Sequence, residues 1–281
     1  MQQTITQALS NAAQQFSFAT TTPLLDAEVL LAHLLNVQRS YLYAHPERLL
    51  SIEEQTRFAA LIKKRTQGQP VPYITGHCEF WSLDLMVTPD TLIPRPETEL
   101  LVELALQKSN ASPRWVADLG TGSGAIALAL AQERPDWIIY ATDSSLAALS
   151  VAKANALRLQ IKNIIFCQGI WCAALPRILF DMIVSNPPYV AEDDAHLQQS
   201  VLATEPASAL FSDKDGLKDI QHIIHEARMY LKPGGCLLLE HGFSQRECVQ
   251  NQLSKAGYTA VTSQQDFSGL NRVTTGIFGI E

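Results

Sequence analysis

A strand-like run, a glycine-rich loop and a helix-like run follow one another near the middle of the chain, and this succession limits the possible folds more than any other segment. Residues 115–119 have the apolar composition of a buried strand, and residues 125–132 that of a buried helix. Three glycines between them allow a tight turn and a close approach of a ligand to the backbone. This succession is typical of nucleotide sites, so we expect the loop to bind a cofactor through Gly120, Thr121, Gly122 and Gly124.

Strand-like and helix-like segments alternate after this loop. Such alternation is typical of an α/β fold with a mostly parallel, doubly wound sheet of the Rossmann kind. Ligands of these sheets bind beyond the carboxyl ends of the strands, where Gly120, Asp143 and Asn186 are all expected. The expected strands are 115–119, 137–142, 164–168, 181–185, 235–240 and 273–278.

Two acidic residues narrow the choice of cofactor. Asp143 ends the second expected strand about 20 residues after the loop, where an acid usually binds ribose hydroxyls. The alternative is a helix N-cap, because a helical run follows. Asp118 precedes the bend, where a carboxylate would disfavour the pyrophosphate of a nicotinamide dinucleotide. The same carboxylate would favour the ammonium group of S-adenosylmethionine.

The sequence Asn186-Pro187-Pro188-Tyr189 follows an apolar run that reads as a buried strand. Two prolines cannot extend that strand, so the backbone leaves the sheet stiff and extended. The Asn186 side chain and the Pro187 carbonyl can each accept one N–H of a planar –NH2 group, and the Tyr189 ring can cover its face. A plain Asn-Pro turn is the simpler alternative. Hydride transfer has no need of such a clamp, so the segment favours S-adenosylmethionine over a dinucleotide.

Several motifs together give the chain a family resemblance over nearly its whole length. It resembles class I methyltransferases and, more narrowly, is similar to the protein-(glutamine) methyltransferases of the HemK/PrmC type, which modify peptide chain release factors. The segment Arg95-Pro96-Glu97-Thr98-Glu99 is more specific than residues 186–189, which adenine amino methyltransferases share. A sister family acting on a ribosomal-protein glutamine usually has Pro-Arg-Ser-Pro there instead. The matching stretches are 72–76, 92–99, the glycine loop, 186–189, 240–242 and Asp266-x-x-Gly269-x-x-Arg272.

The resemblance implies methyl transfer from S-adenosylmethionine to the side-chain amide nitrogen of a release-factor glutamine, with no metal. It places Trp171 against the adenine ring, but Ile170 stands where the family commonly has an Asp that accepts from the adenine amino group. The alternatives are methylation of a ribosomal-protein glutamine or of adenine in nucleic acid, a nonenzymatic binding module, and a dehydrogenase. The implied catalytic residues are Asn186, Pro187 and Tyr189. The substrate would also contact Pro188 and Arg95. We expect Arg95 to pair with Glu97.

The first part of the chain differs in pattern from the rest. Residues 1–70 carry apolar residues at helical spacing, which predicts a helical domain. This domain has no cofactor motif, and a glutamine clamp alone cannot select one glutamine, so we expect the domain to recognise the substrate protein. In this domain Pro23 is expected to begin one helix, and Ser51 to cap another over 52–64. Residues 71–95 are expected to form a linker of short strands with a β-hairpin, in which 79–87 would be one arm. Residues 96–281 are expected to form the methyltransferase domain.

Composition favours a cytoplasmic enzyme. The chain has 281 residues, 47% of them hydrophobic, without a run long enough to span a membrane or a basic, apolar leader. The five cysteines are not spaced as a metal or redox motif, which indicates reduced thiols. The net charge of −7 argues against a nucleic-acid substrate. We therefore expect release factors as partners, and neither membrane nor direct nucleic-acid binding.

Overall fold

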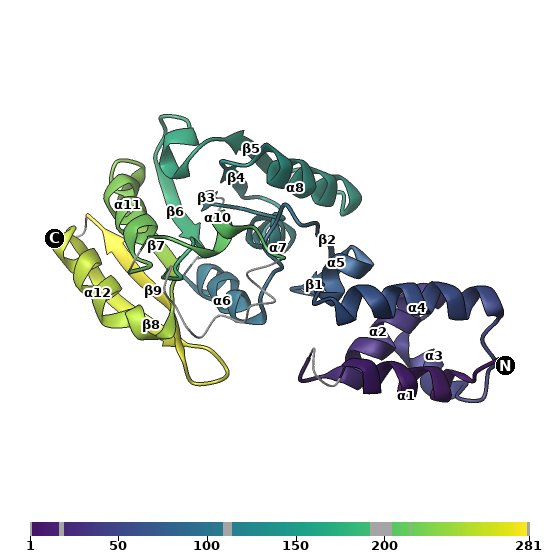
Figure 1. Ribbon diagram of the computed structural model, residues 1–281. Coiled ribbons are helices and arrows are strands. Elements are labelled where there is room, and N and C mark those ends of the chain that lie inside the picture. The colour runs from purple at the N-terminus through teal and green to yellow at the C-terminus, as the bar shows by residue number, and fades with distance from the viewer. Residues whose placement is uncertain (1, 17–19, 109–113, 192–203, 214, 280–281) are drawn as a thin grey trace. The chain divides into compact units, whose positions relative to one another are not determined.

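The computed structural model describes residues 2–16, 20–108, 114–191, 204–213 and 215–279 (Figure 1). Residues up to His77 form one compact unit, and the described residues from Cys78 onward, apart from Thr204, form a second. The break between the units therefore lies within the segment that the sequence indicated as a linker.

The first unit is a bundle of helices around an apolar core. Buried side chains of α1, α2 and α4, such as Phe16, Leu30 and Phe58, meet in this core. Pro23 begins α2 as expected, and Ser51 caps α4 in a capping box with Glu54. The helices are α1 (Ile5–Phe16), α2 (Pro23–Leu35), α3 (Arg39–Ala44), α4 (Ile52–Thr66) and α5 (Val71–Thr75).

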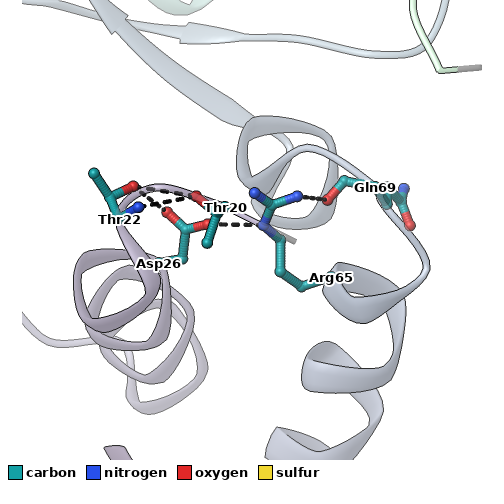
Figure 2. A network of polar contacts seen from close by, with 5 residues as sticks. All are labelled: Thr20, Thr22, Asp26, Arg65 and Gln69. Atoms are coloured by element: carbon teal, nitrogen blue, oxygen red, sulfur yellow. Dashed lines mark hydrogen bonds and ion pairs between the residues drawn. The ribbon is translucent and has the colours of Figure 1, made fainter. Parts of the chain in front are cut away.

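An ion pair joins α2 to α4 at the edge of this core. Arg65 Nε donates to Asp26 Oδ2 at 2.7 Å, and both side chains are nearly buried (Figure 2). The Thr22 hydroxyl donates to the other oxygen of Asp26 at 3.2 Å, and an Arg65 Nη1 group donates to the Gln69 carbonyl. The Asp26 carboxylate therefore has a hydrogen-bond partner on each oxygen, although it is nearly buried.

Two segments after α4 differ from expectation. Residues 71–75 form the short helix α5 instead of a strand. The expected strand 79–87 is broken by a turn, so that β1 (His77–Phe80) and β2 (Leu83–Met86) are both arms of the hairpin. Trp81 and Ser82 occupy this turn with φ of 53° and 58°. Neither residue type is a usual choice for positive φ, so the turn carried no sequence signal.

The second unit is built on a sheet that, within the described residues, has seven strands in the order β5-β4-β3-β6-β7-β9-β8. The first five pair in parallel and the last two antiparallel, which confirms the mostly parallel Rossmann-like sheet. Strand β8 was not predicted. The strands are β3 (Trp115–Leu119), β4 (Ile138–Asp143), β5 (Ile164–Gln168), β6 (Phe180–Ser185), β7 (Leu231–Glu240), β8 (Tyr258–Gln265) and β9 (Asn271–Phe278).

Helices cover both faces of this sheet (Figure 1). Val116 and Met182 pack on one face with α6 and α7, whereas Ala117 and Ile183 pack on the other with α11 and α12. Burial on both faces explains why the parallel strands are continuous apolar runs. The helices and helical turns are η1 (Pro96–Thr98), α6 (Glu99–Gln107), α7 (Ala125–Glu133), α8 (Leu146–Arg158), η2 (Trp171–Ala174), α10 (Ala207–Leu210), α11 (Lys218–Ala227), η3 (Phe243–Gln245) and α12 (Arg246–Lys255).

Strands β4, β3 and β6 are neighbours at the centre of the sheet, and their carboxyl ends lie side by side. Asp143, the glycine loop and Asn186 follow these three ends, as the sequence predicted. None of the helices in the described part of the chain is long and apolar enough to cross a membrane.

Candidate functional site

A cavity of about 450 Å³ opens at the carboxyl ends of β3, β4 and β6. Its lining combines the glycine loop, the end of β4, the segment after β5 and the segment after β6. Seven of the residues singled out from the sequence contribute to it: Gly120, Gly122, Asp143, Ile170, Trp171, Asn186 and Pro188. A smaller adjoining hollow is lined by Arg95, Thr121 and Asn186 among others.

Gly120 allows an aromatic ring to lie against the backbone of the loop. Its φ is +73°, and a Cβ placed there would lie 3.0 Å from the six-membered ring of Trp171. Trp171 itself has a φ of 45°, an uncommon value for a residue with a side chain. Gly120 and Thr121 both donate their backbone N–H to the Thr142 carbonyl, at 2.9 and 2.8 Å. The loop is thus held to the end of β4, with an indole ring on its surface.

Asp143 is bound to the same loop. Its Oδ2 accepts the Gly122 N–H at 2.9 Å, and its Oδ1 accepts the Ser145 N–H at 2.8 Å. Ser145, not Asp143, is the N-cap of α8, because the Ser145 hydroxyl oxygen accepts the Ala148 N–H. The N-cap alternative for Asp143 is therefore wrong. Its carboxylate keeps further lone pairs at the cavity wall.

Asp118 lies beneath the loop and not on the cavity wall. Its side chain is fully buried, and its Oδ2 accepts the Thr121 hydroxyl at 2.6 Å. Burial raises the pKa of Asp118 to about 7, while the Thr121 hydroxyl opposes this shift. Gly124 is also buried, as the N-cap residue of α7 with a φ of +87°.

The segment after β6 is fixed at its first residues. The Ser185 hydroxyl donates to the Leu119 carbonyl at 2.7 Å and ties the ends of β6 and β3 together. Asn186 Nδ2 donates to the Thr98 hydroxyl oxygen at 3.1 Å. Because this nitrogen has a partner in the protein, Asn186 Oδ1 is the atom that can accept from a ligand. Pro187 is buried, whereas Pro188 lines the cavity.

Tyr189 is held at both ends. Its hydroxyl donates to Glu240 Oε1 at 3.2 Å, and its backbone carbonyl accepts from Gln245 Nε2 at 3.0 Å. Its ring packs against the core on the α11 side of the sheet. Burial, and next the neighbouring Glu240 carboxyl, raise the pKa of Tyr189, so its hydroxyl stays protonated at neutral pH. Tyr189 therefore has no role as a base here.

Arg95 does not pair with Glu97. Its Nη2 donates to Glu205 Oε1 at 2.5 Å, and Glu205 Oε2 accepts the Ile93 N–H at 3.2 Å. Glu205 is buried, whereas the Arg95 side chain is one-third exposed. Sequence reasoning missed this partner because Glu205 is 110 residues away.

Other residues of the site gave no sequence signal as members of it. Thr98 contacts Asn186, and Glu240 contacts Tyr189. Both residues stand in stretches that carry the family resemblance, but nothing in the sequence indicated these contacts. Asn155 on α8 links the glycine loop to the hairpin, since it donates to the Ser123 carbonyl and exchanges hydrogen bonds with the backbone of Met86. The cavity is also lined by Pro89, Asp90, Thr91 and Leu92.

Comparisons with known proteins agree with this geometry. Residues 7–76 match the family described as PrmC N-terminal domain, and residues 96–212 match the methyltransferase small domain. A methyltransferase structure from Pyrococcus furiosus shares the fold, with a TM-score of 0.54, 20% identity, and coverage of 70% of this chain and 90% of that one.

Two curated relatives are similar over almost their whole length. A release factor glutamine methyltransferase of Coxiella burnetii is 50% identical over 96% of this chain and 97% of its own. One of Shewanella oneidensis is 46% identical over 98% and 96%. At this identity and coverage, the chain belongs to the release factor glutamine methyltransferase family.

Proposed function

We propose that this protein transfers the methyl group of S-adenosylmethionine to the side-chain amide nitrogen of a glutamine in a peptide chain release factor. The observation that carries this proposal is the position of Asn186. It lines the cavity beside the glycine loop, and its Nδ2 is bonded to Thr98, so that its oxygen can accept from an amide. Family membership supports the choice of glutamine as the substrate.

The cavity suits S-adenosylmethionine. At about 450 Å³ it has the volume of a typical small-molecule site. Asp143 would accept hydrogen bonds from the ribose hydroxyls, and Trp171 would contact the adenine ring. Ile170 lines the cavity beside Trp171. Asp118 beneath the loop would favour the positively charged methionine end, together with Gly120, Thr121, Gly122 and Gly124. When bound, the cofactor would supply an electrophilic methyl group, a chemistry that requires no metal.

The amide nitrogen of glutamine is a poor nucleophile because its lone pair is delocalised into the carbonyl. We propose that Asn186 Oδ1 and the Pro187 carbonyl accept its two N–H groups and so fix its orientation. Positioning of this kind supplies roughly 7–11 kcal/mol when the geometry is ideal. The two acceptors also stabilise the positive charge that develops on the nitrogen. Tyr189 and Pro188 would cover the amide plane and exclude water, and the proton would leave to solvent.

Selection of one glutamine requires contacts outside the clamp. We propose that the helical unit, described by the sequence as residues 1–70, recognises the release factor. We propose that residues 71–95 are a linker and that residues 96–281 are the methyltransferase domain. Arg95 lines the smaller hollow together with Asn186, and we propose that it contacts the substrate there. Its ion pair with Glu205 would hold it in place. No nucleic acid is part of this proposal.

The test is transfer of labelled methyl groups from S-adenosylmethionine to purified release factors, with the modified residue mapped by mass spectrometry. We expect one methylglutamine in the release factor. Label in RNA or in a ribosomal protein, with an unmodified release factor, would contradict the proposal. Cofactor binding without any turnover would instead support a binding module.

A further inference from the structure

Two chain segments that line the large cavity are joined by a buried side chain. Residues 89–92 belong to the cavity wall. The α10 segment, defined as residues 205–212, contributes to the same wall with Pro206, Ser208 and Ala209. Glu205 begins the α10 segment, and Ile93 directly follows residues 89–92. A bond between Glu205 and Ile93 is therefore a bond between two parts of the cavity wall.

Glu205 is held on both of its carboxylate oxygens. Its Oε2 accepts the Ile93 N–H at 3.2 Å, and its Oε1 accepts from Arg95 Nη2 at 2.5 Å. The Glu205 side chain is only 2% exposed, so these partners replace the water that would otherwise solvate the carboxylate. Loss of the carboxylate would leave the Ile93 N–H without its acceptor, a cost comparable to a lost hydrogen bond.

The other end of the α10 segment is fixed through the backbone. The Val190 N–H donates to the Leu210 carbonyl at 3.0 Å, and the Ser212 N–H donates to the Val190 carbonyl at 3.1 Å. Val190 directly follows the clamp residues 186–189. Between these two anchors, α10 has four residues, which are too few to be stable as an isolated helix. The place of this part of the cavity wall therefore depends on its anchors.

We infer that Glu205 is a positioning residue for the cofactor, which holds the α10 segment to residues 89–93 and so keeps the cavity in its binding form. Glu205 is not itself among the residues that line the cavity. A wall that is already in place needs no ordering when a ligand binds, so its anchor adds to affinity without touching the ligand. The inference rests on the proposed function, which supplies S-adenosylmethionine as the ligand.

The experiment measures the affinity for S-adenosylhomocysteine by calorimetry, which also counts the binding-competent molecules. Glu205→Ala removes both bonds, and we expect the dissociation constant to rise about tenfold or more, as for a lost hydrogen bond to a charged group. Glu205→Gln keeps one oxygen for the Ile93 N–H but loses the ion pair, so its effect should be smaller. In methyl transfer, the loss should appear in the KM for S-adenosylmethionine more than in kcat.

Asp181→Asn is the matched control. Asp181 combines the same two kinds of bond as Glu205, because it accepts the Trp115 N–H at 2.9 Å and pairs with Lys232 Nζ at 2.9 Å. It lies near the beginning of β6, whereas Asn186 follows the end of that strand. Both Asp181→Asn and Glu205→Gln should lower stability toward urea, but only Glu205→Gln should weaken the affinity for S-adenosylhomocysteine. The pair of variants separates positioning from a general effect on folding.

Arg95 tests the same anchor from its other partner, and replaces Glu205→Ala if that variant does not fold. Arg95→Met removes the charge and should weaken S-adenosylhomocysteine several-fold. Arg95→Lys keeps the charge and should recover most of the affinity, since one guanidinium nitrogen bonds to Glu205. Because calorimetry is done without a release factor, a direct contact of Arg95 with the substrate does not affect this result.

Two results would overturn the role of Glu205. One is wild-type affinity in Glu205→Ala or, if that variant does not fold, in both Glu205→Gln and Arg95→Met. The other is an equal loss of affinity in Asp181→Asn at the same loss of stability. A wild-type protein that binds S-adenosylhomocysteine but methylates no release factor would instead overturn the proposed function and leave the role of Glu205 intact.

Discussion

Three buried carboxyl groups, Asp26 of the helical unit and Asp118 and Glu240 of the sheet unit, differ in how many hydrogen-bond partners they have. In the helical unit, Asp26 is nearly buried but has a partner on each oxygen, Arg65 and Thr22. In the sheet unit, Asp118 and Glu240 are fully buried with too few partners, and burial raises the pKa of each to about 7. Perturbed carboxyl groups of this kind gather at functional sites. Both of these carboxyl groups lie at the carboxyl ends of strands, β3 and β7, on the side of the sheet where the proposed site is.

The largest expected effect tests the clamp at those strand ends. Asn186→Ala should slow methyl transfer on the order of a few hundredfold, because removal of one such acceptor costs about 3–4 kcal/mol. Cofactor binding should persist, since the clamp contacts the substrate amide. Single-turnover kinetics and calorimetry with S-adenosylhomocysteine measure the two quantities. A rate within a few-fold of wild type would remove Asn186 from the mechanism.

Deletion of residues 1–77 asks whether the helical unit contributes only recognition. We expect methylation of an intact release factor to fall on the order of a hundredfold, since the few residues that dominate an interface are lost with it. Affinity for S-adenosylmethionine should change little, and a short glutamine-containing peptide should react as before. Equal methylation of the folded factor by both proteins, or a wild-type preference for the peptide, would leave the unit without a recognition role.

Asp143→Ala tests how the sheet unit binds the cofactor. Loss of hydrogen bonds to a charged acceptor should weaken S-adenosylmethionine and S-adenosylhomocysteine alike, by roughly 1.5–3 kcal/mol. Calorimetry with both compounds measures the change. Unchanged affinity would mean that Asp143 serves only the backbone N–H groups of Gly122 and Ser145. Ser145→Ala is the matched control, because it removes the helix cap and keeps the carboxylate.

The smallest effect is a pH dependence of stability in the cofactor-free protein. Burial raises the pKa of Asp118 to about 7, so the folded chain binds this proton more tightly than the unfolded chain. The resulting stability is present at low pH and is lost as pH rises through about 7. Between pH 5 and pH 8, Asp118→Asn should lose less stability than wild type, by about 2 kcal/mol.

Urea denaturation followed by tryptophan fluorescence measures this difference. The four tryptophans, at positions 81, 115, 137 and 171, all belong to the sheet unit, so their signal reports on the unit that contains Asp118. Parallel stability curves for wild type and Asp118→Asn would show that Asp118 does not titrate in this range.

Much of the sheet unit could be predicted because its signals are local. Apolar runs identified β3, β5 and β6, and the glycines identified the loop that follows β3. Strand β8 was missed because it lies at the edge of the sheet, and most of its residues are partly or fully exposed. The hairpin turn was missed because Trp81 and Ser82 are unusual residues at positive φ. Glu99, far away in sequence, accepts the Trp81 N–H at 2.8 Å, and the nearby Glu79 accepts the Ser82 N–H at 2.6 Å.

The sequence by itself determined that Gly120, Asp143 and Asn186 meet at one place, because parallel strands end at one edge of a sheet and these residues lie at three of those ends. Only the tertiary structure decided how those groups are held and charged. Thr98 meets Asn186 across 88 residues of sequence, and Tyr189 meets Glu240 across 51. Hydrogen-bond direction and pKa depend on burial and on neighbours in space, and sequence spacing contains neither.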